Sequence, residues 1–255
     1  MFPLRDNIPS RTTPFVCYFI VAACMLTFLM QLADGSGGNK MIQEYGMVPL
    51  RISAPDQTPM IPQQVVVQTT RGPMVTVEKR PMLPSKVSPY LTILTCIFLH
   101  GGWMHILGNM WFLYIFGDNV EDRLGHVGFA LLYLVTGSLA SLAHYVASPD
   151  SPIPTVGASG AIAGVMGAYA WFYPHAKVQA VLPLIIIFQI FIIPAPVFLG
   201  IWFVIQTVSG VMSSGAEAAG VAWWAHIGGF VAGGLIAVLA GRAHLDRSAV
   251  TQRRF

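Results

Sequence analysis

GASGAIAGVMGAYAWFYP, residues 157–174, is an apolar segment without a charged side chain. Its glycines at 160, 164 and 167 recur every three or four residues, so they lie on one face of a helix. A face of small side chains lets a second helix approach closely, which is one way that helices associate inside a bilayer. The segment therefore predicts a membrane-embedded helix over 159–174 that packs tightly against another helix.

The segment AHIGGFVAGG, residues 225–234, offers a matching small-residue face. We expect the contact between the two helices to be lined by glycines, namely Gly157, Gly160, Gly164, Gly229 and Gly233. The first helix carries Ser159 and the second carries His226. Close packing of the two helices would therefore bring a hydroxyl and an imidazole within hydrogen-bond reach.

The rest of the chain has the composition of a membrane protein. Of its 255 residues, 55% are hydrophobic and only 10% are charged, and the mean hydropathy is +0.63. A soluble domain carries about 25% charged residues, so lipid must solvate most of this chain. The apolar runs that can cross about 30 Å of hydrocarbon are 14–33, 103–119, 127–147, 159–174, 195–212 and 221–241. The expected fold class is an all-α polytopic membrane protein, a bundle of six transmembrane helices.

Two regions fall outside these runs. Residues 34–89 are rich in proline, basic and amide side chains, and they predict a long polar first loop with a short β-hairpin around Gln64–Val77. Residues 178–194 are very apolar, but their prolines leave a stretch too short to cross the bilayer, so we expect a buried or interfacial segment. The predicted division is a tail over 1–13, a membrane domain over 14–241 and a basic tail over 242–255.

Basic residues predict the orientation, because cytoplasmic loops carry an excess of Lys and Arg. With six spans both termini share one side, which collects Arg5, Arg11, Arg123, Lys177, Arg242, Arg247, Arg253 and Arg254. We therefore expect both termini in the cytoplasm, in a bacterial inner membrane or, as the alternative, an organelle membrane. The run 14–33 is longer than the apolar core of a signal peptide, about 7–15 residues, so a retained helix is expected.

Polar side chains inside spans are costly unless they are paired, so each is a candidate for function. The notable ones are His105, Asn109, His144, Ser159, Gln206 and His226. In the predicted topology, the second, fourth and sixth spans begin on the outer side of the membrane. His105, Asn109, Ser159 and His226 lie near the beginnings of these spans, so they are expected to share one layer near the outer face.

A serine and a histidine in this layer predict acyl-transfer chemistry. Ser159 becomes a nucleophile when a neutral imidazole takes its proton, and His226 is suited to that role. His105 and Asn109 share a helical face and can donate to a developing oxyanion, together with the backbone N–H of Ser159. No Asp or Glu lies in the layer, so we expect a dyad whose His226 is oriented by packing. An N-cap role is the alternative for Ser159.

Three segments resemble the motif blocks of rhomboid intramembrane proteases, in the family's order. They are 100–110 (HGGWMHILGNM), 157–160 (GASG) and 225–233 (AHIGGFVAG), and the resemblance covers residues 95–241. It implies roles for five residues, which are Ser159 as nucleophile, His226 as general base, His105 and Asn109 as oxyanion-stabilising residues, and His100 beside a water-accessible cavity. The chain departs from some rhomboids at Ala163, where they carry an aromatic residue that stacks on the base.

The resemblance implies an enzyme that cuts single-span membrane proteins in or near the span, without cofactor or metal. A zinc site is not expected because the chain contains no HExxH motif. Expected partners are transmembrane substrates and the lipid bilayer, and the absence of a basic helical stripe argues against nucleic acid. The alternatives are a catalytically inactive rhomboid-like binder and a transporter. The physiological substrate and the oligomeric state are left open.

Overall fold

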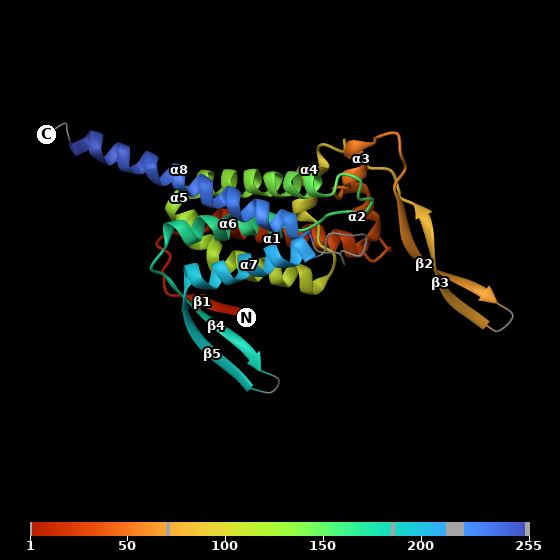
Figure 1. Cartoon of the computed structure of the whole chain (residues 1–255), viewed down its shortest axis with the longest axis horizontal. Coiled ribbons are helices and arrows are strands. Elements are labelled where there is room, and N and C mark those ends of the chain that lie inside the picture. The colour runs from red at the N-terminus through yellow and green to blue at the C-terminus, as the bar shows by residue number, and fades with distance from the viewer. Residues whose placement is uncertain (1, 70–71, 185–186, 213–221, 253–255) are drawn as a thin grey trace.

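The computed structural model describes residues 2–69, 72–184, 187–212 and 222–252 of the chain (Figure 1). The helices are α1 (Phe15–Ala33), α2 (Asn39–Tyr45), α3 (Pro49–Ser53), α4 (Thr92–Thr95), the 3-10 turn η1 (Cys96–Phe98), α5 (Trp103–Ala147), α6 (Ser159–Phe172), α7 (Ala195–Met212) and α8 (Trp223–Gln252). The strands are β1 (Phe2–Asp6), β2 (Met60–Thr69), β3 (Gly72–Pro81), β4 (Lys177–Leu184) and β5 (Ile187–Pro194).

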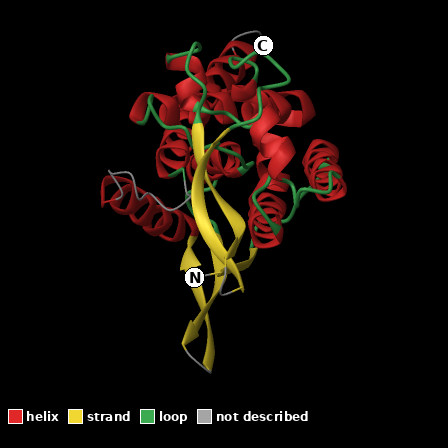
Figure 2. Cartoon of the chain, turned by 90° about the vertical axis from the view of Figure 1, so that its right-hand side faces the viewer, coloured by secondary structure: helices red, strands yellow, loops and turns green. Residues whose placement is uncertain are grey.

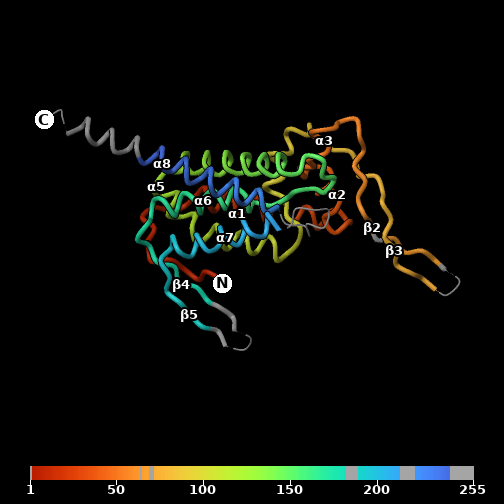
Figure 3. The backbone as a smooth tube through the Cα atoms, viewed as in Figure 1, coloured from red at the N-terminus to blue at the C-terminus, as the bar shows by residue number. Residues whose placement is uncertain are grey.

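The long helices run along the long axis of the molecule and form one bundle, with the β2–β3 hairpin projecting at one end (Figure 1). Figure 2 views the bundle from that end and shows the strands projecting beyond the gathered helices. Figure 3 traces α8 along the bundle to its opposite end, where β4 begins and β5 ends. Helix α6 lies inside the bundle, in contact with α5, α7 and α8, and every residue from Gly160 to Tyr169 is buried. Ser159, the first residue of α6, is half-buried at the start of this enclosed helix.

Four helices of the described chain are long and apolar enough to cross a membrane, namely α1, α5, α7 and the Trp223–Gly241 part of α8. Helix α5 has 45 residues, and a positive φ of 72° at Gly125 breaks it into two arms. These arms contain the expected spans 103–119 and 127–147. Helix α6 has only 14 residues and is too short to be counted among the four. The chain is a helical integral membrane protein, and the number of six spans stays a prediction.

The all-α expectation is wrong in one respect, because the described residues also form two antiparallel sheets. One is the three-stranded sheet β1–β4–β5, and the other is the β2–β3 hairpin. The hairpin expected around Gln64–Val77 is confirmed, and it extends over Met60–Pro81. The described part of residues 178–194, which leaves out 185 and 186, forms no helix, as expected, but pairs as strands β4 and β5, which suits its many β-branched and aromatic residues. The N-terminal segment, expected as a tail, supplies β1, whose Pro3 pairs with Ala180.

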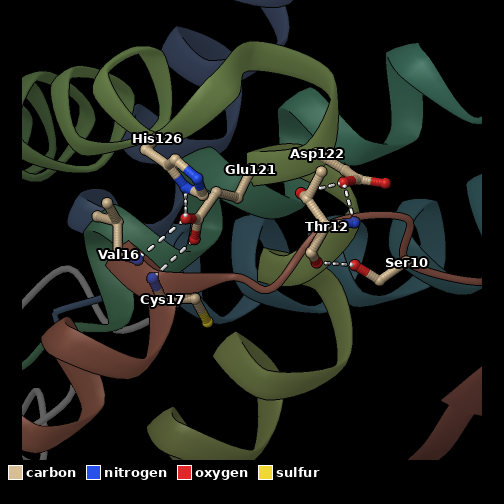
Figure 4. Close-up of polar contacts among 7 residues, drawn as sticks. All are labelled: Ser10, Thr12, Val16, Cys17, Glu121, Asp122 and His126. Atoms are coloured by element: carbon tan, nitrogen blue, oxygen red, sulfur yellow. Dashed lines mark hydrogen bonds and ion pairs between the residues drawn. The ribbon is translucent and has the colours of Figure 1, made fainter.

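Buried Glu121 joins α1 to the bend between the two arms of α5 (Figure 4). Its carboxylate accepts hydrogen bonds from the backbone N–H groups of Val16, at 2.9 Å, and Cys17, at 2.8 Å. The ring of His126 contacts the same carboxylate, and Asp122 accepts from the backbone N–H groups of the segment before α1. The first N–H groups of a helix lack partners within the helix, so Glu121 provides acceptors at the start of α1, while Asp122 holds the segment that precedes it.

Candidate active site

Helices α6 and α8 touch through their backbones. A Cβ placed on Gly233 would overlap the carbonyl oxygen of Gly164, and one on Gly229 would overlap the carbonyl oxygen of Gly160. Side chains at these positions would force the helices apart, so glycine is required by the space available. Gly157 differs from the other four predicted glycines. It lies before α6 with a φ of +129°, and a Cβ there would stand 2.7 Å from Nε2 of His105.

The close packing brings Ser159 and His226 together. Oγ of Ser159 lies 2.7 Å from Nε2 of His226, so the hydroxyl can donate to the imidazole. Ser159 is the first residue of α6, while Ala158 occupies the N-cap position and makes no side-chain capping hydrogen bond. The alternative that Ser159 serves as the N-cap of the helix is therefore wrong. Its side chain is directed to a histidine that follows it by 67 residues.

His105 and Asn109 direct hydrogen-bond donors toward the same region. Nδ1 of His105 accepts from the backbone N–H of Gly101, at 3.2 Å. In a neutral ring the proton then sits on Nε2, the nitrogen that faces Gly157 beside Ser159. Nδ2 of Asn109 is buried and has no hydrogen-bond partner within the described part of the chain. Because buried polar groups are almost always paired, an unpaired donor beside a nucleophile is suited to receive an oxyanion.

A cavity of about 220 Å³ lies beside the polar side chains described above. Ser159, His105 and Asn109 line it, together with the apolar residues Met104, Phe112, Ile162, Ala163, Met166 and Trp202 and the backbone of Gly108. Its wall is thus apolar, with a few polar groups at one place, as in most small-ligand sites. Position 163 is alanine, and the aromatic rings next to His226 belong to Trp202 on α7, at 5.8 Å, and Trp223 on α8, at 6.2 Å.

His100 lies next to this group of residues. Its ring centroid is 5.3 Å from that of His105, and the residue is only 1% exposed. The side-chain amide of Gln31, on α1, holds the main chain of His100 through two hydrogen bonds of 2.9 and 3.0 Å. Both ring nitrogens of His100 lack partners among the described residues. A buried imidazole with free nitrogens is a place where a water molecule can bind.

Gln206 is the residue that sequence reasoning did not include in the site. Its Oε1 lies 2.6 Å from Nδ1 of His226, on the other side of the ring from Ser159. We expected His226 to be oriented by packing and not by a carboxylate; the ring meets no carboxylate among the described residues, but it has a hydrogen-bonding partner on α7 that this expectation did not include. The signal was present, because Gln206 is a polar residue within an apolar span. Nothing in its spacing from His226 indicated that the two side chains meet.

Comparison with known proteins gives matches of one kind. A family model described as "Rhomboid domain" matches residues 88–243. "Rhomboid protein 1, mitochondrial" of Saccharomyces cerevisiae is 31% identical over 158 residues, which is 58% of this chain and 41% of that protein. "Rhomboid-like protein 11, chloroplastic" of Arabidopsis thaliana is 44% identical over 71 residues, 28% of this chain and 25% of that protein. "Rhomboid protease GluP" of Bacillus subtilis is 43% identical over 76 residues, 30% of this chain and 14% of that protein.

Proposed function

The chain belongs to the rhomboid family, and from this premise we propose that it is an intramembrane serine protease with Ser159 as nucleophile and His226 as general base. The observation that carries the proposal is the 2.7 Å hydrogen bond between the Ser159 hydroxyl and Nε2 of His226. The chain spans 14% to 41% of the length of the relatives described above, so the activity is argued from its own residues.

The proposed reaction begins with transfer of the Ser159 proton to Nε2 of His226 while Oγ attacks the carbonyl carbon of the substrate. The negative oxygen that forms is stabilised by the ring N–H of His105, the amide of Asn109 and the backbone N–H of Ser159. The backbone N–H is free for this purpose because a first helical residue has no acceptor within its helix. His226 then donates the proton to the leaving amine. A water molecule, entering beside His100, hydrolyses the acyl enzyme by the same steps.

The proposed substrates are single-span membrane proteins, cut in or near the span. A peptide bond inside a transmembrane helix is shielded by its own hydrogen bonds, so attack requires local unwinding. We expect substrates with Gly, Ala, Ser or Pro near the cut. Gly, Pro and Ser make unwinding easier because they are poor helix formers, and small side chains leave the carbonyl group accessible. The apolar wall of the cavity beside Ser159 supports this class of substrate.

The proposed arrangement in the membrane has six spans, with both termini in the cytoplasm of a bacterial cell. It divides the chain into a tail over 1–13, the membrane domain over 14–241 and a basic tail over 242–255. The two arms of α5 and the short, enclosed α6 support this topology, since with α1, α7 and α8 they provide six helical segments. In this arrangement two spans within α5 bring the start of α6 to the side on which α5 starts, and one span each in α6 and α7 bring the start of α8 to that side too.

The test uses the full chain reconstituted in liposomes with a single-span reporter substrate and a fluorophosphonate probe. Ser159→Ala and His226→Ala should each lower cleavage by about 10³-fold or more and abolish or slow probe labelling. Ser138→Ala is the matched control, because its hydroxyl bonds only to Leu134 of its own helix among the described residues. Cleavage by Ser159→Ala at the wild-type rate would refute Ser159 as the proposed nucleophile. If the wild-type protein binds the substrate but neither cleaves it nor reacts with the probe, the chain is an inactive member of the family.

A further inference from the structure

The imidazole of His226 has a hydrogen bond at each nitrogen. Nε2 faces the Ser159 hydroxyl at 2.7 Å, and Nδ1 faces Oε1 of Gln206 at 2.6 Å. Gln206 lies on α7 and is only 8% exposed, so water has little access to compete for its carbonyl oxygen. The three side chains come from three different helices and form one continuous chain of hydrogen bonds.

The order of these bonds determines which nitrogen carries the proton. A neutral imidazole has one N–H and one lone pair, and the base can accept the serine proton only through a lone pair on Nε2. The proton must then be on Nδ1, where it needs an acceptor. The carbonyl oxygen of Gln206 is such an acceptor, so the hydrogen bond stabilises the tautomer that is ready to act as a base.

Among the residues that the structure describes, Gln206 is the polar side chain that meets Nδ1 of His226. The rings of Trp202 and Trp223 lie 5.8 and 6.2 Å from the ring of His226, and neither presents an acceptor to Nδ1. In serine hydrolases outside membranes, a carboxylate usually holds this position. Inside a bilayer a buried carboxylate would carry a large desolvation penalty. An amide supplies an acceptor without that cost.

We infer that Gln206 is a positioning residue that fixes the tautomer and orientation of His226, taking the place of the acid of a catalytic triad. The inference rests on the proposed function, since it assigns a partner to the proposed base. Gln206 touches no reacting atom, and it acts through His226 alone. As the imidazole becomes protonated during attack, the amide dipole also stabilises the Nδ1–H that the ring retains.

The expected consequences separate this role from simple packing. Gln206→Leu keeps the size of the side chain but removes the acceptor, so kcat should fall about 10- to 100-fold while KM changes less than about twofold. Gln206→Asn withdraws the amide by one carbon–carbon bond, about 1.5 Å, and should cause a similar loss. Gln206→Glu keeps an acceptor at the same reach and should recover activity toward that of wild type. A carboxylate there would also stabilise protonated His226 and move the acid limb of the pH–rate profile to higher pH by about one unit.

The experiment measures cleavage of the liposome reporter across pH, the rate of fluorophosphonate labelling and thermal unfolding in detergent. Thr207→Val is the matched control, because it alters the neighbouring residue, whose hydroxyl bonds to the backbone of Phe203. Loss of labelling rate in Gln206→Leu and Gln206→Asn, with recovery and an altered pH limb in Gln206→Glu, would support the inference. If Gln206→Leu and Gln206→Asn both fold and both cleave and label at the wild-type rate, the inference is overturned while the protease assignment stays intact. Wild type that labels no faster than Ser159→Ala would overturn the protease assignment, and the inference with it.

Discussion

Gly233→Ala tests the idea that the catalytic distance is determined by backbone contact between α6 and α8. A Cβ at position 233 would lie 2.6 Å from Cα of Gly164 and would overlap its carbonyl oxygen. Optimal contacts between carbon atoms are about 3.5–4.0 Å, so the helices must separate by about 1 Å. Position 233 is seven residues beyond His226 in the same helix, about 10 Å along its axis, so the displacement should reach the imidazole.

The size of the effect follows from the hydrogen bond that the displacement breaks. The 2.7 Å distance between Oγ of Ser159 and Nε2 of His226 would grow to about 3.7 Å, beyond the range of a hydrogen bond. A misplacement of about 1 Å can reduce an enzymatic rate about 10²-fold. Overpacking of this kind costs about 1–3 kcal/mol of stability, so part of the protein should still fold. We therefore expect cleavage to fall about 10²-fold, together with a lower melting temperature.

The assay compares Gly233→Ala with Gly200→Ala. Both changes place one methyl group in an apolar helix, but a Cβ at position 200 of α7 meets nothing within 4 Å. The measured quantities are reporter cleavage per folded molecule, fluorophosphonate labelling and the thermal midpoint in detergent. If Gly233→Ala cleaves within about twofold of Gly200→Ala, the helices do not need backbone contact to position the dyad. That result would refute the packing argument without affecting the identity of the catalytic residues.

Two further predictions concern other parts of the molecule. Gly108 lines the cavity beside Ser159, and a Cβ there meets nothing within 4 Å, so Gly108→Leu should obstruct the cavity. Reporter cleavage should fall about tenfold, while labelling by a small fluorophosphonate stays within about twofold; equal losses in both assays would contradict a steric effect on substrate. Burial raises the pKa of Asp6 in β1, and the hydrogen bond from Tyr169 only partly offsets this. A carboxyl with a raised folded-state pKa gains stability as pH falls through that value. Asp6→Asn should thus melt higher than wild type at pH 7.5, with the difference vanishing at acid pH, and a lower melting point at pH 7.5 would count against it.

The geometry of the dyad follows from local sequence patterns to a large extent. Glycines at helical spacing predicted that the helices carrying Ser159 and His226 approach closely, and the overlaps at Gly229 and Gly233 have this origin. Apolar run length predicted the two arms of α5, because a long run with at most one charged residue, Asp118 at its end, lies in lipid whether or not the helix continues through its bend. Both arguments use only short-range periodicity and composition.

The remaining features depend on contacts between distant segments. β1 pairs with β4 across more than 170 residues, and the tail sequence gives no alternation strong enough to predict a strand at that place. The apolar composition of residues 178–194 predicts a buried or interfacial segment but not its conformation, because strands form only where a pairing partner is present. Gln206 reaches His226 because α7 and α8 pack side by side, and the rotation of α7 that directs one amide inward is set by tertiary contacts.

The two interfaces of α8 therefore have different physical character. Against α6 the contact is made by backbone atoms at glycines, which have no rotamers through which the spacing could relax. Against α7 it is made by large side chains, with the rings of Phe203 and Phe230 at 4.8 Å and those of Trp202 and Phe230 at 6.1 Å. Aromatic rings can shift and repack at a cost of about 1 kcal/mol. The distance between Ser159 and His226, the proposed nucleophile and base, is thus held by the rigid interface, whereas the Gln206 contact depends on the adaptable one. Changes in α7 packing, such as those caused by a bound substrate helix, are expected to alter the orientation of His226 before they alter its distance from Ser159.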